Sequence, residues 1–208
     1  MTITAIPQGT DEWKRERLGH VTASRVADVM AKVKTGEAKT REKYRYEIVT
    51  QRLTNEIVDG YTNDAMAWGT EQEPYARMAY EARTGNFVNQ VGFVKHWGIK
   101  WVGASPDGLV GDDGLIEIKC PNTLTHLKTL ESGKAPSEYI GQMQMQMWVT
   151  GRSWCDFVSY DPRLPDELRY FCIRVNRDND YISAMEKDVL QFLYEVEQTI
   201  KTLKEKSC

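Results

Sequence analysis

Residues 104–119 read Ala-Ser-Pro-Asp-Gly-Leu-Val-Gly-Asp-Asp-Gly-Leu-Ile-Glu-Ile-Lys. The Gly-Asp-Asp-Gly of residues 111–114 is a strong turn signal. The alternation after it predicts a strand over residues 115–120, with Glu117 and Lys119 on one face and apolar side chains on the other. Few structural needs place a carboxylate and an ammonium together on the inward side of an apolar strand. The pair is therefore a candidate functional site.

The same stretch supplies a second carboxylate. Ser-Pro-Asp-Gly-Leu makes a sharp entry that could aim Asp107 at the cavity of Glu117 and Lys119. Carboxylates suit Mg²⁺ or Mn²⁺, and the backbone carbonyl of Ile118 could complete a site. Lys119 could hold an attacking water or offset developing negative charge. These parts fit metal-assisted phosphodiester hydrolysis, although a turn Asp beside an exposed Glu–Lys strand edge is an alternative.

Bulk composition indicates an ordinary globular protein. The 208 residues are 41% hydrophobic and 27% charged, which suits one domain with a sizeable core. No apolar run approaches the ~20 residues that span a bilayer, and the amino terminus lacks a signal pattern, so we expect a cytoplasmic protein. The four cysteines show no C-x-x-C spacing. Reduced thiols are therefore expected rather than a zinc or iron–sulfur site.

Charge placement says more than the net charge of −3. Residues 32–45 hold six basic and two acidic side chains, and Lys14, Arg15 and Arg17 form a basic patch upstream. Taken alone, the first of these segments is best interpreted as a solvated helical face. The six tryptophans are expected mainly in the interior, and the three histidines, which lack a metal or triad spacing, as structural or surface groups.

Periodicity along the chain predicts an α/β (α+β) domain: helices, a central mixed sheet, one helix packed on the sheet and a covering C-terminal helix. We expect a single domain over residues 1–208, with helices of residues 10–85 packed on a sheet core of residues 86–208. The predicted helices are a short one capped by Thr10, a second opened by Thr22 or Ser24, and those of residues 40–58, 65–83, 138–149 (capped by Ser137) and 180–205. The predicted strands, besides 115–120, are 88–95, 100–103, 154–160 and 169–176.

Several ordered motifs resemble one family. Ser105-Pro106-Asp107-Gly108-Leu109, followed by Glu117-Ile118-Lys119-Cys120-Pro121, resembles the PD-(D/E)XK nuclease superfamily. More narrowly it resembles the lambda exonuclease branch, which is grouped with the YqaJ-type viral recombinases. Matching segments follow in order over roughly residues 10–200: Arg17 with Leu18-Gly19 and Thr22-Ala23-Ser24, Ala67-Trp68-Gly69 with Glu73 and Arg77, Tyr139 with Gln142 and Gln144, and Tyr160-Asp161-Pro162-Arg163.

The resemblance implies a restriction-endonuclease-like core and a homotrimeric ring that digests one strand of duplex DNA. Digestion would run 5′ to 3′, processively, with two Mg²⁺ ions per site, for which Mn²⁺ could substitute. It would release mononucleotides and leave a 3′ single-stranded tail for annealing recombination. The implied partners are duplex DNA ends and a single-strand annealing protein, with no membrane. The implied setting is the cytoplasm of a bacterial host, with the gene carried by a phage or prophage.

By motif position, the resemblance also implies site residues. Metal ligands would be Glu73, Asp107, Glu117 and the carbonyl of Ile118. Lys119 would be the catalytic lysine, and Gln142 would position the attacking water or Lys119. Arg17, Ser24 and Ser105 would bind the 5′-terminal phosphate, a role that a guanidinium fork and two hydroxyls suit.

Two further positions follow from the resemblance. Thr125 stands where lambda exonuclease has an Arg, and Lys128 is no bidentate replacement, so this departure puts dependence on the terminal phosphate in question. A wedge residue that splits the duplex is expected between Asp59 and Met66.

Two alternatives stay open from the sequence. The same side chains could serve an endonuclease of the superfamily, which would cut circular, nick-free duplex. The chain could instead be a catalytically inactive DNA-binding or assembly module that kept the fold.

Overall fold

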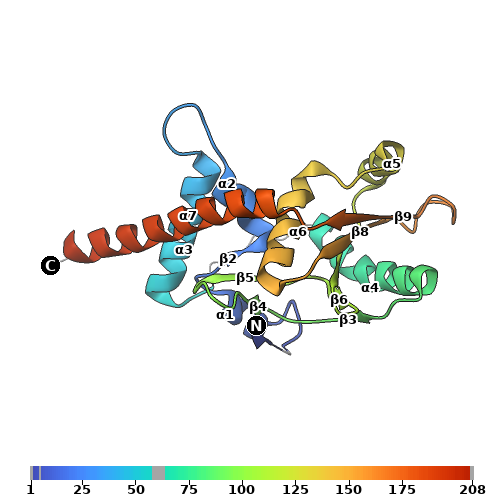
Figure 1. Cartoon of the computed structure of the whole chain (residues 1–208), viewed down its shortest axis with the longest axis horizontal. Coiled ribbons are helices and arrows are strands. Elements are labelled where there is room, and N and C mark those ends of the chain that lie inside the picture. Colours follow the sequence, from blue (N-terminus) through green and yellow to red (C-terminus); the bar gives the residue numbers. More distant parts are fainter. Residues whose placement is uncertain (1, 5, 58–63, 207–208) are drawn as a thin grey trace.

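The computed structural model describes residues 2–4, 6–57 and 64–206. Its centre is a mixed five-stranded sheet (Figure 1). The strands, in spatial order, are β3 (Val88–Asn89), β6 (Gly108–Val110), β7 (Gly114–Lys119), β8 (Trp154–Tyr160) and β9 (Tyr170–Asn176). Only the pairing of β7 with β8 is parallel. The mixed α/β fold class is confirmed, and the strand that bears Glu117 and Lys119 lies in the middle of the sheet.

Helices cover both faces of β7, as its apolar pattern requires. Ile116 and Ile118 pack with Tyr80 of α4 (Asp64–Thr84). Leu115 packs on the opposite side with Met143 of α6 (Ser137–Thr150). Burial of both faces keeps water from the strand interior, so polar side chains on β7 must find partners within the protein.

A second sheet of four short strands was not expected. Its order is β1 (Thr2–Ile3), β4 (Val94–Lys95), β5 (Val102–Ala104) and β2 (Val21–Thr22). The prediction of one strand over residues 88–95 was wrong, because its two ends join different sheets. Gly92 lies at the break: its N–H donates to the Thr4 carbonyl (3.1 Å), and a Cβ would overlap the Ile6 carbonyl. The amino-terminal segment therefore crosses the chain where the two sheets separate.

The amino-terminal helices share their core with the last helix. The elements that share it are the 3₁₀ turn η1 (Ala23–Arg25), α2 (Val26–Met30), α3 (Lys39–Thr54) and α7 (Asn179–Lys206), whereas α1 (Asp11–Arg17) has no buried residue. Helix α7 runs along α2 and α3 (Figure 1). Phe192 of α7, fully buried, stacks on Tyr44 of α3 with ring centroids 5.5 Å apart. Residues from the two ends of the chain thus close one hydrophobic cluster.

Helix ends follow the predictions in part. The Thr10 hydroxyl accepts from the Trp13 N–H (3.2 Å) and caps α1, as predicted. Ser137 was predicted to cap α6 but is its first residue, after Pro136, which makes no side-chain cap. Helix α3 ends at Thr54 rather than residue 58, because Asn55 adopts a left-handed backbone (φ 56°).

Two further local differences concern helices. Thr22 lies in β2 and the segment after it first makes the 3₁₀ turn, so the second helix is only the five residues of α2. Helix α5 (Thr123–Ser132) was not predicted. The Asn122 side chain accepts from the Thr125 N–H (2.9 Å) and caps it, a signal that the sequence did contain.

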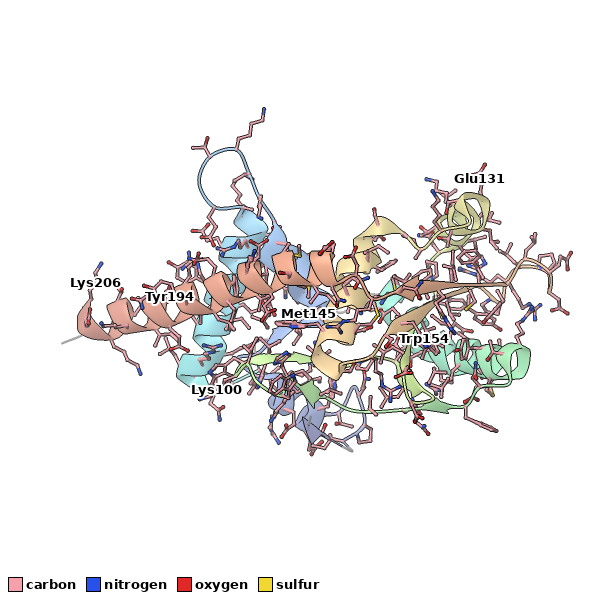
Figure 2. All side chains as sticks on the ribbon, viewed as in Figure 1. Lys100, Glu131, Met145, Trp154, Tyr194 and Lys206 are labelled. Carbon is pink, nitrogen blue, oxygen red and sulfur yellow. The ribbon has the colours of Figure 1, made fainter. Side chains whose placement is uncertain are left out.

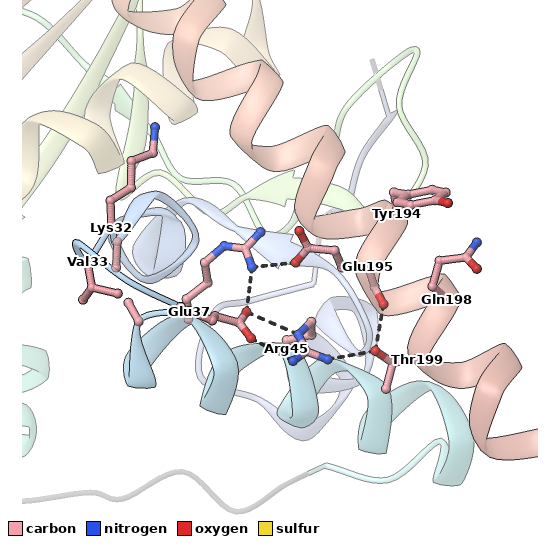
Figure 3. A pocket seen from close by; sticks show the side chains of 12 residues that line it. Lys32, Val33, Glu37, Arg45, Tyr194, Glu195, Gln198 and Thr199 are labelled. Carbon is pink, nitrogen blue, oxygen red and sulfur yellow. Dashed lines mark hydrogen bonds and ion pairs between the residues drawn. The ribbon is translucent and has the colours of Figure 1, made fainter.

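Two arginines of the basic segment 32–45 are not solvated. Arg41 pairs with Glu37 (2.6 Å) and Glu195 (2.5 Å), while Arg45 pairs with Glu37 (2.8 Å). Figure 3 shows this network beside a cavity of about 580 Å³ between the α2–α3 loop and α7. Both arginine side chains are about 15% exposed. The expectation of a solvated face therefore fails for these two residues, because α7 packs over them.

The burial of individual aromatic residues agrees only in part with the predictions. Trp97 is 80% exposed in the turn between β4 and β5, contrary to the interior position expected of the tryptophans. Trp148 is buried, and Trp154 lies half-buried at the start of β8 (Figure 2). His126 is fully buried and contacts the Ser159 hydroxyl (2.7 Å), which confirms a structural role.

The cysteines within the described residues are free: Cys120, Cys155 and Cys172. Cys208 lies outside those residues. Among the helices of the described chain, none combines the length and hydropathy that crossing a bilayer requires.

Candidate active site

The two charged residues of β7 form a buried ion pair at the end of the strand. The Lys119 Nζ lies 2.5 Å from Glu117 Oε1. The Glu117 side chain has no exposed surface, whereas that of Lys119 is 28% exposed. The period-two prediction that these side chains share a face is confirmed. The ammonium thus lies between a buried carboxylate and the molecular surface.

Helix α6 supplies two amides to the same carboxylate. Gln142 Nε2 donates to Glu117 Oε1, and Gln146 Nε2 donates to Glu117 Oε2, each at 2.6 Å. The two glutamines are one helical turn apart, so they point the same way from α6. Gln142 was predicted from the resemblance to act near Lys119, and the structure brings it to the oxygen that Lys119 contacts. Gln146 was not among the predicted site residues.

Asp107 is joined to β7 through the backbone. It precedes β6, and its Oδ2 accepts a 2.6 Å hydrogen bond from the Ile118 N–H. Asp107 therefore lies at the end of β7 that carries Glu117 and Lys119. Glu73 of α4 is half-buried and pairs with Arg77 at 3.4 Å. Asp107 and Glu73 both line one large cavity.

Electrostatics link these carboxylates. Burial raises the pKa of Asp107 well above its usual value, and the negative charges of Glu117 and Glu73 raise it further. Burial likewise raises the pKa of Glu73, with Arg77 opposing the shift. Burial alone would lower the pKa of Lys119, but the charges of Glu117 and Asp107 outweigh it and raise that pKa. The carboxylates Asp107, Glu117 and Glu73 therefore favour positive charge beside them. Lys119 supplies one such charge.

The cavity, about 1100 Å³, also holds a cationic end. Arg17 and Ser24 line it, with Arg17 Nη2 3.5 Å from Ser24 Oγ. Ser105 does not line the cavity, but its hydroxyl accepts a 3.0 Å hydrogen bond from Trp13 Nε1. The Arg17 guanidinium lies 4.0 Å above the Trp13 ring. The three residues predicted to bind a terminal phosphate are thus connected through Trp13, which the sequence analysis treated as a core residue.

Several predicted positions do not line this cavity, contrary to the expectation that Asp107, Glu117 and Lys119 share one. They are Glu117, Ile118, Lys119 and Gln142. Thr125 and Lys128, at the departure from the lambda pattern, lie on α5 and do not line the cavity. In the stretch from Asp59 to Met66 that was expected to contain a wedge, residues 59–63 lie outside the described part of the chain. Met66 is 55% exposed and lines the cavity.

The donor set fits a magnesium ion completed by non-protein ligands. Within residues 2–4, 6–57 and 64–206, no three His, Cys, Asp or Glu side chains are gathered closely enough to hold an ion by themselves. Mg²⁺ commonly uses only one or two carboxylates and takes its other oxygens from water and substrate phosphates. Asp107 and Glu117, joined through the adjacent Ile118, offer two such carboxylates, and their surplus negative charge raises the pKa of Asp107. The metal-ligand roles of Asp107, Glu117, Glu73 and the Ile118 carbonyl all stay predictions.

Family membership follows from the sequence match. Residues 12–153 match the model of the YqaJ-like viral recombinase domain. The chain belongs to this family. Two protein relatives match part of the chain. An uncharacterised protein, R354, of Acanthamoeba polyphaga mimivirus is 26% identical over 172 residues, which cover 75% of this chain. An uncharacterised protein named ExoD of Escherichia coli (strain K12) is 28% identical over 64 residues. The YqaJ-like chain spans 29% of the length of the mimivirus protein and the ExoD match covers 31% of this chain and 72% of ExoD.

Solved structures extend the similarity over nearly the whole YqaJ-like chain. An alkaline exonuclease, LHK-Exo, from Laribacter hongkongensis is 55% identical, with a TM-score of 0.88 and coverage of 95% of this chain and 98% of that chain. A structure of LHK-Exo in complex with dAMP matches with a TM-score of 0.89. A phage-related exonuclease from Haemophilus somnus 129PT shares the fold at 18% identity, with a TM-score of 0.68 over 88% of this chain and 96% of that one. The PD-(D/E)XK fold type and the family assignment are confirmed.

The YqaJ-like site contains residues that the sequence analysis passed over. Gln146 follows Gln142 by four residues, so the helical period contained the signal that both face β7. Trp13 follows the Thr10 cap by three residues, but nothing in the local pattern indicated a bond to Ser105, 92 positions away. Long-range contacts of this kind depend on the topology rather than on local periodicity.

Proposed function

We propose that this protein is a Mg²⁺-dependent exonuclease that degrades one strand of duplex DNA from its 5′ end. The observation that carries the proposal is the Asp107–Ile118 hydrogen bond (2.6 Å), which ties one carboxylate to the strand bearing Glu117 and Lys119. The 55% identity to an alkaline exonuclease over 95% of the chain supports it. A structure of that relative contains dAMP, which is a mononucleotide. It therefore supports release of mononucleotides as the product.

The residues divide the chemistry between them. Asp107 and Glu117 would hold Mg²⁺, with the Ile118 carbonyl and Glu73 completing the ligand sphere. When bound, the ion supplies Lewis-acid polarisation of the phosphate and an acidified water. Lys119 stays protonated at neutral pH, because Glu117 and Asp107 raise its pKa despite its burial. It therefore holds the attacking water and neutralises charge that develops on the phosphate, rather than removing a proton.

The cationic end of the cavity would choose the strand end. Arg17 and Ser24 present a guanidinium and a hydroxyl to the space that Asp107 and Glu73 line from elsewhere. A phosphate dianion satisfies both donors. A terminal 5′ phosphate held there would place the neighbouring phosphodiester toward the carboxylates. Ser105 would act indirectly, by fixing Trp13 beneath the guanidinium.

Assembly and partners are extensions of the same proposal. The family resemblance supports a homotrimeric ring through which the duplex enters and a single strand leaves, with processive release of mononucleotides. It also supports binding of a single-strand annealing protein and the use of two metal ions, with Mn²⁺ as a substitute. Light scattering would show a mass three times the 23.9 kDa chain if the ring forms.

One substrate design tests activity, polarity and metal need together. Linear duplex with a 5′ phosphate on one strand only is incubated with and without Mg²⁺. We expect mononucleotides to be released from the phosphorylated strand, and only with Mg²⁺. The complementary strand should stay intact. Replacing Asp107 by Ala should abolish digestion while duplex binding persists. Lack of any Mg²⁺-dependent digestion by the unaltered protein would establish the inactive binding module instead.

An endonuclease is the competing activity. Circular, nick-free duplex separates the two, because an exonuclease has no end to enter. Linearisation of the circle by the unaltered protein, absent from the Asp107→Ala variant, would replace the exonuclease proposal with internal cleavage.

A further inference from the structure

Gln146 has an unusual environment on α6. The residue has no exposed surface, and its Nε2 donates 2.6 Å to Glu117 Oε2. Its Oε1 is buried without a hydrogen-bond partner among the described residues. A buried carbonyl oxygen left unpaired is costly, so the side chain keeps this arrangement only because turning the amide over would bring two oxygens together. The bond to Glu117 therefore fixes the amide.

The two oxygens of Glu117 are held differently. Oε2 contacts the buried Gln146, whereas Oε1 is shared by Gln142 and Lys119, both of which are partly exposed. The partners of Oε1 are partly exposed and can turn toward solvent, but Gln146 has no such freedom inside a packed core. Only Oε1 can therefore exchange its partners for an ion or a water.

We propose that Gln146 is a positioning residue that locks Glu117 Oε2, so that Glu117 offers Oε1 alone to a divalent cation. This inference rests on the proposed function and adds a residue to it. Partners that orient metal-binding carboxylates commonly change metal affinity by about 10- to 100-fold when they are removed. Without Gln146, Glu117 could rotate and pair both oxygens with Lys119 and Gln142.

Helix α6 provides a matched control. Gln144 is also a buried glutamine, 2% exposed, but it faces away from Glu117. Its Nε2 donates to the Asn176 carbonyl and its Oε1 accepts from the Asp178 N–H, each at 2.9 Å. Replacing either glutamine by Met removes one buried amide from the same helix with a similar volume. Only the Gln146 variant removes a partner of Glu117.

The test is titration calorimetry of Mn²⁺ into the metal-free full chain without DNA. We expect Gln146→Met to weaken Mn²⁺ binding at least tenfold and Gln144→Met to change it less than twofold. Digestion by Gln146→Met should recover as Mn²⁺ is raised, which loss of structure would not allow. Should Gln146→Met fail to fold, Gln146→Asn keeps an amide one methylene too short to reach Oε2, and the same tenfold loss is expected.

The outcomes separate this inference from the proposed function. Equal Mn²⁺ affinity of the unaltered protein and a folded Gln146 variant overturns the role of Gln146 and leaves the exonuclease proposal intact. Weakening by both Met variants alike would assign the effect to α6 packing and also overturn it. Absence of both Mn²⁺ binding and DNA digestion in the unaltered protein would refute the proposed function itself.

Discussion

The Asp107 carboxyl makes the folded protein less stable at neutral pH when no cation is bound. Its pKa is raised by burial and by neighbouring carboxylates, so the folded state resists losing this proton while the unfolded chain loses it near pH 4. A carboxyl with a raised pKa therefore makes the folded protein less stable as pH rises above that value. This is the reverse of the usual salt-bridged aspartate.

The first prediction follows from that cost. Asp107→Asn should melt about 2–4 °C higher than the unaltered protein at pH 7.5 in EDTA, a shift that ~1 kcal/mol produces in a chain of this size. The Asn oxygen can still accept from the Ile118 N–H. The difference between the two proteins should shrink toward pH 4. Thermal melts across pH measure it, with Asp112→Asn, an exposed turn carboxyl, as the control. A lower melting temperature for Asp107→Asn in EDTA would contradict the charge cost.

The positions of the charged residues around β7 were largely predictable from the sequence. The apolar alternation put Glu117 and Lys119 on one face, and the sharp Pro-Asp-Gly entry aimed Asp107 at them, because both signals are local. The residues that hold this cluster in place through their own hydrogen bonds were not predictable. Gln146 and Trp13 contribute through contacts 29 and 92 positions distant in sequence. The helical period shows on which face of a helix a residue lies. It does not show which distant residue packs against that face.

At the scale of elements, the junction of β7 and β8 limits what the sheet tolerates. Gly114 opens β7, and a Cβ there would overlap the Trp154 ring at the start of β8. That ring cannot easily move, because the Arg174 guanidinium lies 3.5 Å above it. The glycine therefore sets the spacing at the far end of the strand that carries the active residues.

Two glycine substitutions make the second prediction. Gly114→Ala should destabilise the protein by about 1–3 kcal/mol through overpacking. Gly69→Ala should stabilise it by up to about 1 kcal/mol, because Gly69 lies within α4 with open space around its Cα. Urea unfolding followed by circular dichroism measures both. Equal stability of Gly114→Ala and the unaltered protein would show that Trp154 moves freely.

Element boundaries were less predictable than element types. The hairpin of residues 154–160 and 169–176 was predicted within one residue, because its alternation is long. The strand predicted over residues 88–95 divided between two sheets, since the amino-terminal segment pairs with Val94 and Lys95. That pairing partner lies some 90 residues away, and no local pattern encodes it. The predictions for α2 and α3 were longer than the helices for local reasons: a 3₁₀ turn precedes α2, and the left-handed backbone of Asn55 ends α3.

At the scale of the molecule, stability of the amino-terminal half depends on α7. Phe192 stacks on Tyr44, and the Tyr44 hydroxyl lies 3.2 Å from the Thr22 N–H, two residues before Ser24 of the cavity. Contacts therefore run from the last helix to the predicted phosphate-binding end. A change on α7 should be felt there even though α7 does not line that cavity.

The third prediction tests this dependence. Phe192→Ala should destabilise the protein by about 3–5 kcal/mol, which lowers the melting temperature by roughly 10 °C. Digestion of linear duplex should then fail at temperatures where the unaltered protein is active, and recover on cooling. Tyr194→Ala, 59% exposed on the same helix, is the control and should change the melting temperature little. Similar losses for both variants would mean that α7 acts through its surface instead.

The sharing of one hydrophobic cluster by α2, α3 and α7 also matters during protein synthesis. Tyr44 and Ile48 leave the ribosome long before Val189 and Phe192 exist, at roughly 5–20 residues per second. For roughly 7–30 seconds the nascent chain therefore exposes apolar groups whose natural cover has yet to be translated. Helper proteins that shield such surfaces, or rapid translation of the final codons, would improve the yield of correctly assembled molecules.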